Sequence, residues 1–348
     1  MIVSTLRHKI QAIASAIAII AAAMTATSCD SLIYDDLDPC GVKLRFVYDY
    51  NMLYANAFPS QVHCLKVLIY DSEGNLVAVR DETDRALLSD EGWAMTIVPE
   101  GDAATPFLPG VYTVKAYGGM NCPESSFHFT GSYPLGSAPG ELGVAMDTDC
   151  YDVTPGVQLH HLFYGEATFE VVERDVEPER IYTVPMMKDT HNIRILLQHL
   201  SGEPVESADF TFTLTDAANS IFDGANNLLP VEPFTIYPWI KGNTVPSGLG
   251  EPILAFAEFS TSRLMADAPM RLLINYKSAP AGRPTVSIPL VPYLLLLKSE
   301  HFGKMTSQEY LDREDYWSVI FFLDENNSWV RTHIVVNNWV VRINEADL

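Results

Sequence analysis

Apolar side chains recur at every second position over much of the chain, and this period constrains the fold more than any other feature. Residues 42–48, VKLRFVY, and residues 270–276, MRLLINY, are two examples. A period of two is that of a β-strand with one buried face. Similar runs lie at 65–69, 111–117, 167–171, 193–197, 210–214, 286–290, 319–323, 334–336 and 339–343. Short strands at this density, with 20 Gly and 22 Pro available for turns, predict an all-β protein built from β-sandwiches.

The length of the chain predicts two domains. It has 348 residues, and those after the first 28 are more than one small core usually serves. Charge and proline interrupt the strand pattern in 173–185, ERDVEPERIYTVP. We therefore expect a first sandwich over residues 41–180 and a second over residues 181–348.

Helical signals are few. Thr306 with a glutamate three residues later predicts a capped short helix that runs to about Arg313, and residues 82–90 favour another turn or two. The most apolar internal run, 287–297, is short and interrupted by two prolines, so we interpret it as core strand plus turn. Residues 324–327, DENN, have the composition of a hairpin tip.

The first 28 residues have the order of a secretory signal. Arg7 and Lys9 give a positive head, Ile10 to Met24 are almost wholly apolar, and small residues follow. The apolar run is shorter than the ~20 residues that a membrane span needs. The alternative, a buried N-terminal helix, does not explain this order, so we predict that residues 1–28 are a signal peptide.

The four residues 26–29, ATSC, resemble a bacterial lipobox. In such signals the cysteine is acylated and becomes the first residue of the mature protein. Ala26 stands where a large aliphatic residue is usual, and ordinary cleavage that leaves Cys29 as an odd thiol is the alternative. We predict that Cys29 carries lipid, since a multiply acylated cysteine anchors firmly, and that the acidic residues 29–40 form an extended tether.

The chain is strongly acidic. Loss of residues 1–28 removes two of the 22 basic residues and none of the 44 acidic ones, which leaves a formal net charge near −24. Nucleic-acid binding needs a basic footprint, so we expect no nucleic-acid partner. Electrostatic adhesion to anionic lipid is disfavoured for the same reason. Any membrane attachment must therefore come from lipid on Cys29.

Four further cysteines follow Cys29, namely Cys40, Cys64, Cys122 and Cys150. An even number in an exported chain permits disulfides, and the three possible pairings cannot be separated from the sequence. No C-x-x-C pair is present, so the spacing does not indicate a zinc site.

No catalytic constellation stands above background. His160 and His161 could ligate a metal, but adjacent strand residues point to opposite faces. Asp147, Asp149 and Asp152 suggest a calcium loop, but the loop glycine and the distal glutamate are not in register, so we interpret them as an acidic turn. We expect neither a cofactor nor a metal, and binding or assembly in place of catalysis.

Glycan binding is the alternative function, and the positions of the tryptophans test it. Trp317, Trp329 and Trp339 lie in or beside apolar strands, where core packing is more frequent than a sugar platform. Exposure of Trp93, Trp239 or Trp329 together on one face would favour a surface glycan-binding lipoprotein. Burial would count against it.

Three blocks of the sequence resemble the fimbrillin-associated anchor lipoproteins, the base subunits of fimbriae of certain anaerobic Gram-negative bacteria. The first runs from Cys29 through an acidic stretch and Cys40 into GVKLRFVYDYN. The second is VHCLKVLIYDSEGNLV at 62–77, followed later by LPGVYTVKAYGG. The third is residues 305–344, from MTSQEYLDREDYW to VVNNWVVRIN. Together the blocks span nearly the whole chain after residue 28.

The resemblance implies two transthyretin-like β-sandwich domains, lipid attachment to the outer membrane and contact with a fimbrial stalk subunit, a fimbrillin. It also implies a role in initiating or limiting fimbrial growth. Acidic residues just after a lipidated cysteine resemble the surface-export signals of such bacteria, so we expect the domains outside the cell.

The C-terminal residues differ from those of a self-polymerising stalk subunit. Only NEADL, residues 344–348, follows the last alternating run, and it is too short and polar for a donor strand. We therefore expect the isolated protein to be monomeric and to engage the stalk through an edge or face of a sandwich, because an unpaired edge presents unmet hydrogen-bonding groups.

Overall fold

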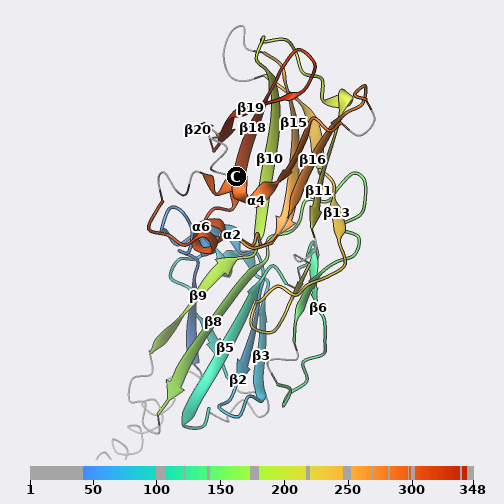
Figure 1. The fold of residues 1–348 in the computed structure, drawn as a ribbon. Helices are drawn as coiled ribbons and strands as arrows, with labels where there is room; N and C mark the ends of the chain where they lie inside the picture. Colours follow the sequence, from blue (N-terminus) through green and yellow to red (C-terminus); the bar gives the residue numbers. More distant parts are fainter. Residues whose placement is uncertain are drawn as a thin grey trace, which may run out of the picture.

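The protein consists of two β-sandwiches stacked end to end in an elongated body (Figure 1). The computed structural model describes residues 42–98, 107–120, 122–138, 142–172, 180–216, 220–245, 252–268, 270–280, 283–296, 298, 302–337 and 339–342. The predicted all-β class is confirmed. Among the described residues, no helix is both long and apolar enough to cross a membrane.

The first sandwich is a seven-stranded sheet that folds over on itself, in the order β3-β2-β5-β8-β9-β1-β4. Its strands are β1 (Val42–Val47), β2 (Leu65–Tyr70), β3 (Leu76–Glu82), β4 (Met95–Ile97), β5 (Gly110–Gly118), β8 (Phe163–Val171) and β9 (Ile181–Lys188). Side chains of β1 and β2, far apart in sheet order, share one core: Leu44 and Phe46 lie in the same cluster as Val67 and Ile69. The alternating apolar residues of the sequence are therefore the side chains that form this core.

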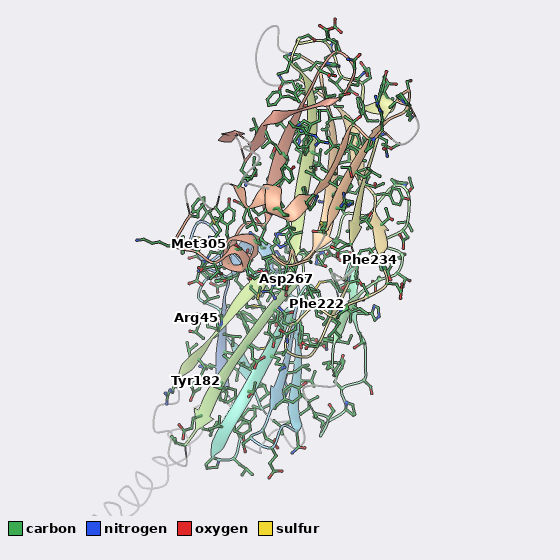
Figure 2. The ribbon with its side chains drawn as sticks, in the orientation of Figure 1. Arg45, Tyr182, Phe222, Phe234, Asp267 and Met305 are labelled. Atoms are coloured by element: carbon green, nitrogen blue, oxygen red, sulfur yellow. A yellow bond between two sulfur atoms is a disulfide. The ribbon has the colours of Figure 1, made fainter. Side chains whose placement is uncertain are left out.

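The outer face of β2 is covered as well. Leu68 and Tyr70 belong to a second apolar cluster, together with residues of a small sheet formed by β6 (Phe127–Phe129), β7 (Val144–Met146) and β12 (Ile221–Phe222). All six residues of β2 are consequently buried. Phe222, which β12 contributes from the second half of the chain, lies at the junction of the two sandwiches (Figure 2).

The second sandwich packs a six-stranded sheet on a four-stranded one. The first is β14-β15-β10-β18-β19-β20 and the second is β13-β11-β16-β17. Alternate residues such as Ile193 and Phe321 from one sheet meet Phe212 and Leu272 from the other in a single core. The strands are β10 (Thr190–His199), β11 (Phe210–Asp216), β13 (Phe234–Ile236), β14 (Ile240–Thr244), β15 (Leu254–Ser262), β16 (Arg271–Tyr276), β17 (Val286–Pro289), β18 (Tyr316–Leu323), β19 (Trp329–Val336) and β20 (Trp339–Arg342).

The boundary between the sandwiches differs from the predicted one at residue 180. β9 begins at Ile181, yet it pairs with β1 and β8 and so completes the first sheet. A single residue, Asp189, separates β9 from β10, the central strand of the second sandwich. The start of the second sandwich therefore moves from residue 181 to about residue 190, and the pairing of β12 with β7 ties the two parts together.

The predicted short helices are present. In α6 (Ser307–Arg313) the Thr306 hydroxyl accepts a hydrogen bond from the Glu309 N–H at 3.0 Å, which confirms the predicted cap. α3 (Arg85–Leu88) lies within the predicted 82–90. The remaining short helices are α2 (Phe58–Gln61), α4 (Leu290–Leu294) and the 3-10 turn η2 (Ser207–Asp209).

The run 287–297 was predicted as strand plus turn, and a helix replaces the turn. β17 ends at Pro289 and α4 follows at once. The proline at position 292 lies in the first turn of α4, where no intrahelical donor is needed. Leu290, Val291 and Leu294 are buried, so the apolar run serves the core.

Candidate functional site

The two sandwiches meet at a buried polar joint, formed by Lys188, Asp189, Arg263, Asp312 and Asp315. Arg263, from the segment after β15, donates two hydrogen bonds of 2.8 Å to the Asp312 carboxylate in α6. Its Nε lies 4.0 Å from Asp189, which is fully buried between β9 and β10. A bidentate guanidinium–carboxylate pair fixes orientation as well as distance, so α6 is held rigidly against the inter-sandwich connection.

A second ion pair lies in the same joint. Lys188, the last residue of β9, donates to the Asp315 carboxylate at 2.5 Å and to the Gln61 side chain at 3.1 Å. The Lys188 side chain is only 3% exposed. Since Gln61 ends α2 and Asp315 precedes β18, one ammonium group joins both sandwiches.

The electrostatics of the joint follow from its burial. Burial raises the pKa of the Asp189 carboxyl to about 7, against the opposing effect of Arg263 and of Asn226, whose amide donates to both Asp189 oxygens at 3.1–3.2 Å. Burial also raises the pKa of Glu314 to about 7 and lowers the pKa of His191 to about 4. The joint is therefore stable when all of its charged groups are paired, and removal of one partner lowers the free energy of unfolding.

A loop of the first sandwich closes over the joint. The Arg313 guanidinium lies over the rings of Tyr50 and Tyr54, 4.1 and 4.6 Å from their centroids. The Met52 N–H donates to the Arg313 carbonyl at 3.1 Å. Ion pairs, ring contacts and backbone hydrogen bonds therefore join the two sandwiches at this joint.

The strand directions place Val42 and the ends of β10 and β18 at opposite poles of the body. β1 is parallel to β9, and β9 runs toward the joint, so Val42 lies at the far end of the first sandwich. β10 and β18 are parallel and run away from the joint (Figure 1). Their ends at His199 and Leu323 mark the opposite pole.

We call that opposite pole the distal tip and define it by Leu200, Val245 and the hairpin of residues 324–328. Leu200 is 61% exposed and Val245 57% exposed. The Asp324 carboxylate accepts from the N–H groups of Asn326 and Ser328 at 2.9 Å, which confirms the predicted hairpin. Two exposed apolar side chains and an ordered hairpin therefore mark this pole.

The predicted cysteine sites have separate outcomes. Cys29 and Cys40 lie outside the described residues. Cys64 and Cys122 form a disulfide. Cys150 is a buried free thiol whose pKa burial raises to about 11, so it takes no part in the Cys64–Cys122 disulfide. It lies in the second apolar cluster.

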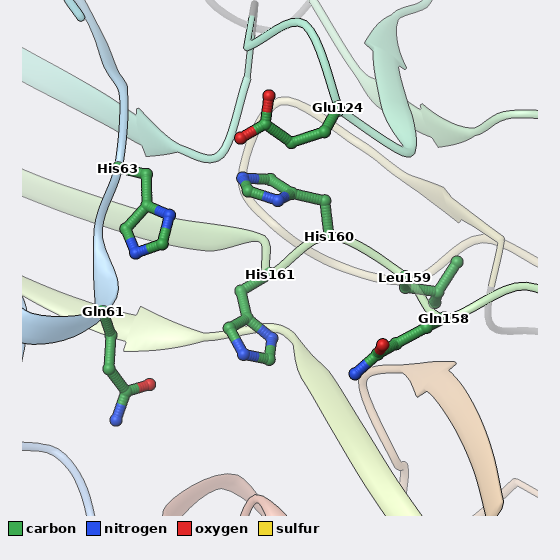
Figure 3. A pocket seen from close by; sticks show the side chains of 7 residues that line it. All are labelled: Gln61, His63, Glu124, Gln158, Leu159, His160 and His161. Atoms are coloured by element: carbon green, nitrogen blue, oxygen red, sulfur yellow. The ribbon is translucent and has the colours of Figure 1, made fainter. Parts of the chain in front are cut away.

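His160 and His161 do not lie in a strand, so the expectation of opposite faces is wrong. They precede β8 and line one pocket of about 380 Å³ with His63, Glu124 and two glutamines (Figure 3). The sequence offered no sign of this convergence, because His63 and Glu124 come from other segments.

Two of the three aspartates expected in an acidic turn contact other segments of the chain. Asp147 lies 2.5 Å from the His128 ring, and Asp152 accepts from the Thr235 N–H at 2.7 Å. Within the described part of the chain, one group of three metal-ligand side chains is gathered: Cys64, Cys122 and His160. Its two sulfurs are bonded to each other.

The tryptophans do not form an exposed platform in the described structure. Trp317 is fully buried and Trp329 is 9% exposed, both in the second core. Trp93 is half-buried against Phe46 in the first sandwich, and Trp239 is half-buried in the second. Of Trp339 the structure describes the backbone only. Core packing therefore accounts for Trp317 and Trp329.

Comparison with known proteins gives the family. Residues 35–345 match the fimbrillin-A associated anchor proteins Mfa1 and Mfa2. No curated protein matches the sequence. A candidate adhesin from Bacteroides thetaiotaomicron is 42% identical with a TM-score of 0.79, covering 89% of this chain and 100% of that one.

Two further solved structures share the fold. A candidate polysaccharide-binding protein from the same organism is 27% identical with a TM-score of 0.72, over 89% of this chain and 100% of that one. The fimbrial anchor protein Mfa2 from Porphyromonas gingivalis has a TM-score of 0.61 at 15% identity, over 87% and 99%. Because the family match covers most of the sequence, the chain belongs to the family of fimbrillin-A associated anchor proteins Mfa1 and Mfa2.

Proposed function

We propose that this protein is a lipid-anchored base subunit that attaches a fimbria to the outer membrane and limits or initiates its assembly. The family match over residues 35–345 is the observation that carries the proposal. The lipid is on Cys29, after removal of residues 1–28 as a signal peptide. The net charge of −22 supports attachment by lipid in place of a basic face.

The geometry of the body supports a direction for the attachment. Val42 lies at the pole opposite the distal tip, so a tether of residues 29–40 would leave the first sandwich on the membrane side. Two strands in line, β9 with 8 residues and β10 with 10, at roughly 3.3 Å per residue, place the distal tip about 60 Å farther out. The stalk subunit, a fimbrillin, then binds the second sandwich.

Contact through the second sandwich is supported by its surface. The distal tip exposes Leu200 and Val245. Among the described residues, β14 and β20 end the six-stranded sheet, and an extended segment of a partner can add to such an edge. A clamped joint behind this surface transmits load from the stalk to the membrane end without bending.

The alternative is a surface glycan-binding lipoprotein, and one relative is a candidate polysaccharide-binding protein. Burial of Trp329 and the separation of Trp93 and Trp239 between the two sandwiches argue against an aromatic sugar platform. The anchor function is therefore favoured over it and over catalysis.

The proposed direction is tested by capture of the stalk subunit on immobilised protein. Leu200→Asp and Val245→Asp should each weaken capture at least tenfold, since about 1.4 kcal/mol of lost contact corresponds to a factor of ten. Val172→Asp is the matched control, because Val172 is 42% exposed next to the end of β8, at the opposite pole. Loss of capture with Val172→Asp alone would reverse the direction, and stalk capture unaffected by all three variants would reject the distal tip.

A further inference from the structure

The pocket with three imidazoles is built on a braced frame. His63 precedes β2, Glu124 lies between β5 and β6, and His160 and His161 precede β8. The disulfide joins the residue after His63 to the residue two before Glu124. The His160 N–H donates to the Ser126 hydroxyl at 2.9 Å, so three segments distant in sequence are fixed around one opening.

One close approach shows how tightly the frame is held. Gly119 adopts a φ of +84°, and its N–H donates to the Cys64 carbonyl at 3.0 Å. A Cβ at this position would lie 1.9 Å from the His161 carbonyl oxygen. The backbone that carries the imidazoles is therefore fixed, and only side chains at the rim are free to turn.

His63 and His160 lie slightly farther apart than two ligands of one cation. The ring centroids of His63 and His160 lie 6.1 Å apart with an interplanar angle of 61°. Two imidazoles on one tetrahedral Zn²⁺ have centroids about 5 to 5.5 Å apart, because each Zn–N bond is about 2.0–2.1 Å. A rotation of the exposed His63 side chain closes this difference.

The surroundings of the His160 ring supply a negative ligand. The Glu124 carboxylate lies beside the His160 ring and is exposed (Figure 3). Two imidazoles with one carboxylate are ligands that a zinc-class cation accepts.

We propose that this pocket binds a divalent cation of the zinc class through His63, His160 and Glu124. Binding needs a change of rotamer at His63 and Glu124, toward the fixed His160. The bound cation would join the start of β2, the β5–β6 connection and the segment before β8 close to the joint, and so stiffen the first sandwich. His161 is not part of the proposed ligand set, and its Nδ1 lies 3.4 Å from the Thr190 hydroxyl.

The test is calorimetric titration of the purified, oxidised protein with ZnCl₂, repeated with CoCl₂ and read by its visible absorption. We expect one site with a dissociation constant below about 10 µM. His63→Ala, His160→Ala and Glu124→Gln should each weaken binding at least tenfold. His128→Ala is the control, since His128 is exposed and pairs with Asp147 outside the pocket.

A second readout separates ligation from folding. Zn²⁺ should raise the unfolding temperature of the unaltered protein and of His128→Ala, but not that of His63→Ala, whose exposed side chain takes no part in the core. Three results would overturn the proposal: no binding to the unaltered protein, equal binding by the His63 variant, or binding that appears only after a thiol reductant opens the disulfide. The last result would assign the ligands to the Cys64 and Cys122 thiolates.

Discussion

Arg263→Ala is the perturbation that tests the buried joint most sharply. The Arg263 side chain is 15% exposed, and it pairs with Asp312, which is 4% exposed. Its removal leaves the carboxylates of Asp312 and Asp189 buried without that cation. Loss of one partner of a buried ion pair costs about 3–5 kcal/mol.

Hydrogen bonds that remain in the variant place the expected loss near the lower end of this range. Gln308 still donates to Asp312 at 2.8 Å, and Asn226 still donates to both Asp189 oxygens. We therefore expect Arg263→Ala to lower the free energy of unfolding by about 3 kcal/mol. At about 2–4 °C for each kcal/mol, the unfolding temperature should fall by roughly 6–12 °C.

The assay is urea unfolding followed by tryptophan fluorescence, with two comparison variants. Arg263→Lys keeps the charge but loses the bidentate fork, so its loss should be intermediate. Arg271→Ala is the matched surface control, because Arg271 is exposed and donates to the Ser287 hydroxyl at 3.1 Å; it should change stability by less than about 0.5 kcal/mol. A loss below about 1 kcal/mol for Arg263→Ala, or one equal to that of Arg271→Ala, would refute the joint as a source of rigidity.

Two further predictions concern pH and disulfide linkage. Burial raises the pKa of Glu314 to about 7, so its folded state holds a proton that the unfolded state releases, and this stabilisation is lost as pH rises from about 4.5 through 7. Between pH 5 and pH 8 in urea unfolding, Glu314→Gln should therefore lose less stability than the unaltered protein does. A pH profile equal to that of the unaltered protein would contradict the assignment. Peptide mapping after alkylation without reduction should recover Cys64 linked to Cys122 and Cys150 alkylated, whereas any linkage of Cys150 would contradict the structure. Reduction of this disulfide, whose cysteines are separated by 58 positions, should lower the free energy of unfolding by about 4 kcal/mol in the chain-entropy model.

The strands were predictable because burial on one face leaves a local pattern. β1 and β16 show the period of two, and the cap at Thr306 located α6. The partner of a strand leaves no local pattern. β9 was assigned to the second sandwich for this reason, although β1 and β8 are its neighbours.

The candidate sites were less predictable because they join distant segments. Arg263 and Asp312 are 49 positions apart, and neither charge stands out in an acidic chain. His160 and His161 were interpreted as strand residues, yet β8 begins two residues later, and this difference brings both into the pocket. The pairing of Cys64 with Cys122, 58 positions apart, depended on tertiary contact in the same way.

Fractionation of cells that carry Cys29→Ala tests the central claim, attachment of a fimbria through lipid on the base subunit. The account predicts that the protein leaves the membrane fraction and that fimbriae are released into the medium, while a Cys150→Ala control retains both at the cell. Fimbriae that stay cell-bound with the Cys29→Ala protein still in the membrane fraction would contradict the anchor mechanism.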